Sequence, residues 1–159
     1  FGDIYAGYVS KKMGLPINKL VIATNKNDIL KRVVNTGYYK PSEVKHTVSP
    51  SMDIQVASNF ERLIFDISSG SSERTIKLMK DLNELGEFKI EKSELKKIKD
   101  NFLAESLSEE ETKSIISETY KNHKILIDPH TAIGVGVIEK ISFKTSFTVF
   151  GLFVPALNT

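Results

Sequence analysis

Three short polar segments carry the side chains that could bind or transform a substrate. The first, Thr24 to Asp28, reads Thr-Asn-Lys-Asn-Asp and follows a short apolar run. Ligands of open α/β sheets bind beyond the carboxyl ends of the strands. Amide and hydroxyl groups at that place suit a polar, phosphorylated or amino-acid substrate. A turn followed by a helix cap explains the segment equally well.

The other two segments also lie where helices are predicted to begin. Asp128-Pro129-His130-Thr131 contains a histidine that could carry a proton, because imidazole titrates near neutral pH. A structural hydrogen bond at a helix start is the simpler interpretation. Phe1-Gly2-Asp3 could present backbone N–H groups to a phosphate, with glycine allowing close approach. An Asp3 N-cap explains these three residues when they are taken alone.

The composition limits the classes of protein that need to be considered. The chain has 159 residues, of which 40% are hydrophobic and 26% charged, as in an ordinary globular domain. Cysteine is absent and the three histidines are scattered, which argues against disulfides and zinc sites. A net charge of +2 is too small to indicate nucleic-acid binding. With no apolar run long enough for a membrane span and no signal peptide, a cytoplasmic protein is expected.

The first part of the chain predicts an α/β layered sheet. A helix is expected from Asp3 to Met13, ending at Gly14, followed by a buried strand at Leu20 to Ala23. A second helix should begin after Asp28 and end at Gly37. This order of helix, strand and helix is typical of an α/β fold. Ser58 to Glu61 reads as a capping box that opens a further helix.

The middle and end of the chain predict a helical excursion from this core. The stretch from Glu73 to Glu111 is charged and almost wholly helical in pattern, with one helix ending at Gly86 and another, capped by Ser93, reaching Leu103. A second capping box, Ser108 to Glu111, opens the next helix. Ile125-Leu126-Ile127 is expected to form a short buried strand. Gly134 and Gly136 then lie in a helix, where they indicate close packing.

These patterns divide the chain into four units. Residues 1–67 form an α/β part, and residues 68–124 form a helical, charged insertion. Residues 125–144 return to the core, and residues 145–159 form an atypical apolar tail that carries no charge.

Six segments together resemble threonine synthase. They occur in that family's order and at fitting distances: Phe1 to Tyr8, Lys12 to Ile17, Ala23 to Asp28, Ser49 to Val56, Ser58 to Leu63 and Asp128 to Gly134. Each segment is weakly specific by itself, but six in order are highly specific. The resemblance covers the chain from Phe1 to about Lys140.

The resemblance implies a fold-type II, tryptophan synthase β-like enzyme that depends on pyridoxal phosphate. That family converts O-phosphohomoserine and water into threonine and phosphate, with the cofactor on a lysine as a Schiff base. Phe1 and Gly2 match the end of the family's Gly-Asn-Phe-Gly phosphate loop, so the residues expected at the cofactor are Phe1, Gly2 and Asp3. Polar residues of the matched segments are expected to bind substrate: Asn25, Asn27, Asp28, Ser51, Asp53, His130 and Thr131.

The same resemblance implies that catalytic parts lie outside these residues. The Schiff-base lysine belongs to the family's N-terminal half, and Ser142-Phe143-Lys144 repeats its motif only at the wrong place. No catalytic residue is therefore assigned, and the chain alone is expected to be inactive unless a complementary polypeptide supplies that half. The tail after Lys144 lacks the family's Thr-Ala-His-Pro motif, as a frameshift would leave it. The alternative function is a non-catalytic remnant or a binding module.

Overall fold

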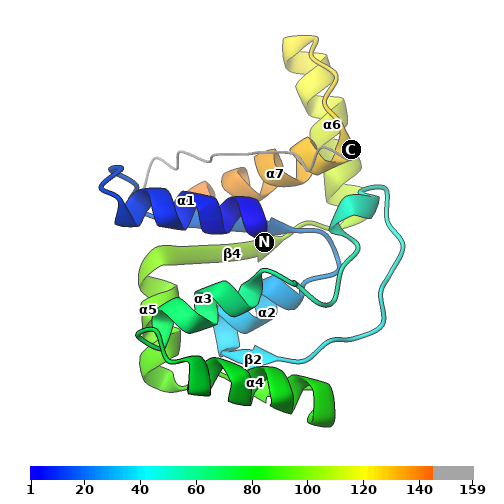
Figure 1. Ribbon diagram of the computed structural model, residues 1–159. Helices are drawn as coiled ribbons and strands as arrows, with labels where there is room; N and C mark the ends of the chain where they lie inside the picture. The colour runs from blue at the N-terminus through cyan, green and yellow to red at the C-terminus, as the bar shows by residue number, and fades with distance from the viewer. Residues whose placement is uncertain (145–159) are drawn as a thin grey trace.

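A computed structural model describes residues 1–144, so the predicted apolar tail, 145–159, lies outside the described residues. Its elements follow the chain in this order: α1 (Gly2–Lys12), β1 (Leu20–Thr24), α2 (Ile29–Thr36), β2 (Tyr38–Tyr39), the 3₁₀ helix η1 (Pro50–Met52), α3 (Phe60–Ile67), α4 (Ser72–Leu85), β3 (Phe88–Lys89), α5 (Lys92–Asn101), β4 (Phe102–Ser106), α6 (Glu109–His123) and α7 (Pro129–Lys144). Figure 1 shows α6 projecting away from the remaining elements. None of the described helices is long and apolar enough to cross a membrane.

Two parallel strands form the sheet on which the site is built. β1 pairs with β4 in a register that places Leu20 opposite Phe102 and Thr24 opposite Ser106. The pairing continues past the strand ends, where Leu107 N donates to Thr24 O at 2.9 Å. β2 and β3 form a separate antiparallel pair. Strands packed against helices confirm the predicted α/β class (Figure 1).

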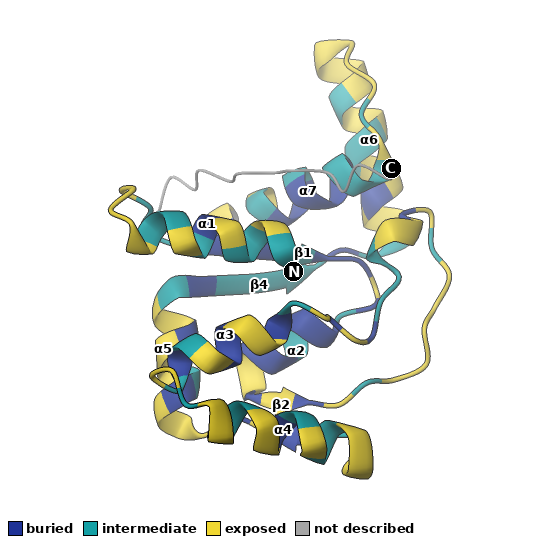
Figure 2. Cartoon of the chain, in the orientation of Figure 1, coloured by how far each residue is buried: buried dark blue, intermediate teal, exposed yellow. Residues whose placement is uncertain are grey.

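The two faces of β1 and β4 contact different helices. Leu20, Ile22 and Phe102 belong to the main core, to which α1, α2, α3 and α5 also contribute. On the opposite face, Val21 and Ala23 contact a second cluster formed mainly by α7. Dark blue residues in Figure 2 mark these buried surfaces between the elements. The sheet is therefore covered on both faces, as is usual for parallel strands.

Several predicted helix ends are confirmed. Gly37 and Gly86 end α2 and α4 in the left-handed conformation, which glycine adopts without the penalty of a Cβ atom. Ser108 and Glu111 form both hydrogen bonds of a capping box at the start of α6. Close packing at Gly136 is also confirmed, because a Cβ there would lie 2.7 Å from Leu107 Cδ2.

Two secondary-structure predictions were wrong. The helix expected to reach Leu103 ends at Asn101, because residues 102–106 pair with β1 as a strand. This segment falls inside the predicted insertion of 68–124 and joins it to the sheet, so the division into core and insertion stays a proposal. Ile125, Leu126 and Ile127 form no strand, and the first two are exposed rather than buried.

Three predicted helix caps were also wrong. α1 has Phe1 rather than Asp3 at its N-cap, and α3 has Asn59, whose side chain makes no capping hydrogen bond. α5 is capped by Glu91 and Glu94 instead of Ser93. In each case the helix begins one or two residues away from the expected position, a shift that local sequence patterns do not resolve.

Candidate functional site

Asp53 is the centre of a hydrogen-bond network directly after β1. Its Oδ1 accepts from Asn25 Nδ2 at 2.7 Å, Asn27 Nδ2 at 3.0 Å and the Thr47 hydroxyl at 2.6 Å. Its Oδ2 accepts from Thr47 N at 2.8 Å. Asn25 and Asn27 are buried. The structure thus brings together three of the predicted substrate-binding residues at the carboxyl end of the strand.

The amides in this network hold the backbone of the following loop. Asn27 donates to Lys45 O and accepts from Lys45 N, both at 2.8 Å. Asn25 also donates to Ser49 Oγ at 3.0 Å and accepts from Asn27 N at 2.8 Å. Because their donors and acceptors are engaged inside the protein, these asparagines position the loop rather than present free groups to solvent. Thr47 and Ser49 were missed from the sequence.

Hydrogen bonding keeps Asp53 ionised. Burial raises the pKa of its carboxyl, but hydrogen bonds from Thr47 and Asn25 and the charge of nearby His46 outweigh burial, so the pKa lies below its ordinary value. One negative charge therefore holds several donors in place. The exposed side chains of Lys45 and His46 lie on the loop that this charge anchors.

A second arrangement fixes the other end of the same loop. Asp28, at the N-cap of α2, accepts from Arg32 Nε at 2.9 Å. Arg32 also donates to Lys40 O at 2.7 Å and to Gln55 Oε1 at 3.1 Å. Asp28 thus orients an arginine that ties the loop to α2. Ser51, in contrast, is exposed in η1 and lies at the surface.

The start of α6 meets this loop at the same edge of the sheet. Glu109 accepts from Val48 N at 3.1 Å and lies 3.5 Å from Lys26 Nζ. Figure 1 shows η1 and its loop beside the base of α6. Residues from the end of β1, the loop and α6 therefore converge beyond the strands, at the position where α/β proteins bind ligands.

His130 and Thr131 are held by Asp128 at the start of α7. Asp128 Oδ1 accepts from His130 N at 2.9 Å and lies 3.0 Å from His130 Nδ1, while the Thr131 hydroxyl donates to Oδ2. The Thr131 hydroxyl bond is the largest cause that lowers the pKa of Asp128 to about 2. Since an ionised carboxylate only accepts, His130 Nδ1 must carry the proton. Its Nε2 is buried and has no hydrogen-bond partner among the described residues.

Removing the charge of Asp128 is expected to make the free energy of unfolding less dependent on pH in the acid range. Its pKa of about 2 lies below the ordinary 3.8, so the ionised form stabilises the fold above pH 3.8 and this contribution is lost as the pH falls toward 2. In Asp128→Asn, the free energy of unfolding should fall less steeply across this interval than in the parent chain. Urea unfolding between pH 2 and 5 measures the difference. Parallel curves would contradict the assigned ionisation.

The start of α1 offers groups that fit a phosphate. The first N–H groups of a helix have no acceptor within it, and they favour anions. A Cβ on Gly2 would lie 3.3 Å from Asn59 Nδ2, so Gly2 leaves room beside that amide. Phe1 points its ring into the core, 5.2 Å from the ring of Phe60, and Asp3 is exposed. Phe1 can therefore contact a phosphate only through its backbone. The side-chain amide of Asn59 is an additional candidate for contact with the phosphate.

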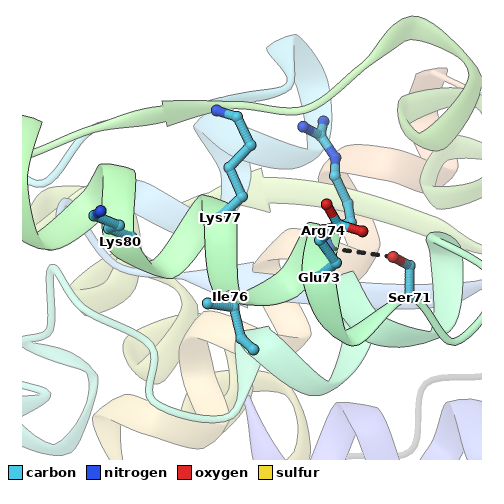
Figure 3. Close-up of a pocket in the computed structure, with 6 residues that line it drawn as sticks. All are labelled: Ser71, Glu73, Arg74, Ile76, Lys77 and Lys80. Carbon is cyan, nitrogen blue, oxygen red and sulfur yellow. Dashed lines mark hydrogen bonds between the residues drawn. The ribbon is translucent and has the colours of Figure 1, made fainter.

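A shallow depression of about 460 Å³ lies along α4, away from these groups. Figure 3 shows its lining residues: Ser71, Glu73, Arg74, Ile76, Lys77 and Lys80. Its cations are already paired with carboxylates, since Arg74 binds Glu94 at 3.0 Å and Lys77 binds Asp81 at 2.8 Å. The depression contains none of the predicted site residues.

Comparisons with known proteins identify relatives of the chain. No protein-family model matches it. It is 43% identical to threonine synthase from Saccharomyces cerevisiae over 91% of the chain and 31% of that protein. It is 41% identical to threonine synthase from Pseudomonas aeruginosa over 85% of the chain and 29% of that protein. The crystal structure of PLP-bound threonine synthase from Brucella melitensis superposes with a TM-score of 0.86 and 46% identity, covering 88% of this chain and 30% of that one.

These similarities extend over most of the chain in both sequence and structure. The chain spans less than a third of the length of these relatives. The resemblance is confirmed: the chain is homologous to threonine synthases and has the fold of the corresponding part of these fold-type II enzymes.

Proposed function

We propose that the chain forms part of a threonine synthase, which converts O-phosphohomoserine and water into threonine and phosphate with pyridoxal phosphate. The observation that carries this proposal is the 41–43% identity to threonine synthases over 85–91% of the chain. The buried network beyond β1 supports it, because such a network can hold a substrate-binding loop in one geometry. The cytoplasmic location expected from the sequence remains part of the proposal.

The groups at the start of α1 would hold the cofactor phosphate. The backbone N–H groups of Gly2 and Asp3 and the amide of Asn59 are donors, and a phosphate is an acceptor. When bound, pyridoxal phosphate supplies an electron sink for the reaction. The chain's own contribution is to bind the cofactor phosphate and to orient it against the sheet.

The loop beyond β1 would hold the substrate. Its amides are engaged in the network, so direct contacts fall to exposed basic side chains on either side of it: the ammonium groups of Lys26, which also lies 3.5 Å from Glu109, and Lys45, and the imidazole of His46. Cations suit the phosphate and carboxylate of O-phosphohomoserine. Asn25, Asn27, Asp28 and Asp53 act as positioning residues in this proposal. Ser51, His130 and Thr131 remain candidates for substrate contact.

A chimeric enzyme tests the proposed function. The segment of the Saccharomyces cerevisiae enzyme that matches this chain is replaced by the chain, and phosphate release from O-phosphohomoserine is measured together with threonine. We expect both products in equal amounts. The 159-residue chain by itself is the control and should release none, because no lysine here matches the Schiff-base position. A folded, PLP-loaded chimera that forms no threonine would refute the proposal.

Replacing Asn59 by aspartate in the chimera should weaken cofactor binding. The substitution places a negative charge beside Gly2, where the phosphate is proposed to bind, and repulsion between the two negative charges should lower the affinity for pyridoxal phosphate by about tenfold or more. The matched control is Asn35→Asp at an exposed position of α2, which should leave the affinity unchanged. Titration of the apo-chimera, followed by cofactor absorbance, gives both values. Equal affinities in the two variants would remove Asn59 from the cofactor site.

A further inference from the structure

The carboxylate of Glu109 is held by two donors of different kinds. Its Oε1 accepts from the backbone N–H of Val48 at 3.1 Å, and its Oε2 lies 3.5 Å from Lys26 Nζ. The N–H comes from the loop before η1, the ammonium from the segment after β1, and Glu109 is the first residue of α6. Two donors from separate segments thus meet one oxygen each of a single carboxylate. Such an arrangement suits any oxyanion.

Val48 supplies the exchangeable N–H of this part of the loop. Thr47 N donates to Asp53 Oδ2 at 2.8 Å, and Ser49 N donates to Thr47 Oγ1 at 3.0 Å, so both neighbouring N–H groups are engaged inside the network. The N–H of Val48 instead bonds a carboxylate whose side chain is 28% exposed. Of these three N–H groups, it is therefore the one that can exchange its acceptor for a group from solvent.

The contacts that keep Glu109 in place are weak. Lys26 is 35% exposed and the charged atoms are 3.5 Å apart, and ion pairs of this kind contribute little to stability. The start of α6 has its own support, because Ser108 and Glu111 form a capping box and Glu111 also pairs with Lys140 at 2.9 Å. A released Glu109 carboxylate would still lie in the first turn of α6, where negative charge is favourable. The carboxylate can therefore leave at little cost.

We infer that Val48 N–H and Lys26 form a binding site for an oxyanion of the substrate, and that Glu109 occupies this site as an internal competitor until the oxyanion displaces it. The inference rests on the proposed function, which supplies a substrate with a phosphate and a carboxylate. Both groups offer acceptor oxygens and negative charge in place of Glu109. The exposed side chains of Lys45 and His46 lie on the same loop and would add to the attraction for an anion.

Titration of the 159-residue chain with inorganic phosphate tests this site, with the backbone amide resonance of Val48 as the local readout. At constant ionic strength we expect saturable binding, and in Glu109→Gln an affinity about threefold higher, because the competing charge is removed. A merely structural role of Glu109 predicts an equal or lower affinity. The matched control is Glu110→Gln, which makes the same change of charge in the same turn of α6. Since Glu110 bonds neither Val48 nor Lys26 in the described part of the chain, this variant should keep the affinity of the parent.

Two further measurements define the site. Lys26→Gln should weaken phosphate binding by about fivefold or more, with amide resonances away from the loop unchanged as the check on folding. Titration with acetate compares a carboxylate with phosphate, and the ion that binds more tightly identifies the substrate group that this site takes. Absence of a saturable shift at Val48, or an affinity in Glu109→Gln no higher than in the parent, would overturn the inference.

The phosphate titration is independent of the chimera, because it needs neither pyridoxal phosphate nor the Schiff-base lysine. An inactive chimera combined with phosphate binding at Val48 would refute the proposed function and leave the oxyanion site. An active chimera combined with no binding at Val48 would refute the oxyanion site alone. The Val48 resonance also separates this site from the start of α1, where the cofactor phosphate is proposed to bind.

Discussion

Replacing Asp53 with alanine is expected to lower the rate of threonine formation by the chimera about 100-fold, since small misplacements of binding groups have effects of this size. The variant removes the acceptor of four hydrogen bonds and leaves Thr47 N and one N–H of the Asn27 amide without an acceptor, whereas Asn25 keeps its bonds to Thr47 and Ser49. The 159-residue chain should also lose about 3 kcal/mol of unfolding free energy, because each buried donor without a partner costs roughly 1–3 kcal/mol. Steady-state kinetics of the chimera and urea unfolding of the chain give the two values.

A control aspartate lies on α5. Asp100 pairs with Lys96 at the surface, where its side chain is 57% exposed, so Asp100→Ala should leave the unfolding free energy close to that of the parent chain. The ionisation of Asp53 should also make the unfolding free energy depend on pH. Its lowered pKa means that the stabilisation by the carboxylate is present at neutral pH and is lost as the pH falls through the folded-state pKa. Equal losses in Asp53→Ala and Asp100→Ala would contradict the anchoring role.

Replacing Phe60 with alanine is expected to give the largest loss of stability. The side chain is 2% exposed, and its ring lies 5.2 Å from that of Phe1 and 5.5 Å from that of Tyr39. Removing a buried phenylalanine ring costs about 3–5 kcal/mol through lost burial and the cavity left behind. Urea unfolding of the 159-residue chain measures the change.

The same helix provides the matched control for this substitution. Phe65 is 45% exposed, so Phe65→Ala should lower the unfolding free energy by about 1 kcal/mol or less. The comparison keeps residue type and helix constant and changes only burial. If the two variants lose equal stability, the side of α3 assigned to the core is wrong.

Local chemistry explains which parts of the fold could be predicted. The glycines at 37 and 86 end helices because they adopt the left-handed conformation, and Ser108 begins α6 through side-chain hydrogen bonds to its own first turn. β1 is short, apolar and β-branched, which indicates a buried strand without reference to other segments. Each of these features depends on residues that are close together in the sequence.

The features that could not be predicted depend on distant partners. Phe102 and Leu103 continue the pattern of the lysine-rich helix, but residues 102–106 form a strand because β1 pairs with them. Ile125–Ile127 has a strand pattern, and the described residues provide no strand beside it. Tertiary pairing outweighs local preference in both places.

The candidate site also combines features that depend on nearby residues, which could be predicted, with features that depend on distant residues, which could not. Asn25 and Asn27 were predicted because they lie in a matched segment after a strand, and Asp53 because it lies in another matched segment. Their positioning role was not, since it depends on burial and on Thr47 and Ser49 from a separate loop. Asn59 lies in the matched segment Ser58 to Leu63, but it was interpreted as part of a cap. Its position beside Gly2 appears only when α1 and α3 are packed together.

Growth without threonine provides the most direct test of the proposed function. A Saccharomyces cerevisiae strain that lacks its own threonine synthase would express the chimera carrying this chain, or the same chimera with Asp53→Ala. We predict growth without added threonine for the first and none for the second, with both proteins present at equal levels. If the first chimera is present and folded and the strain still requires threonine, the proposal that this chain forms part of a threonine synthase is contradicted.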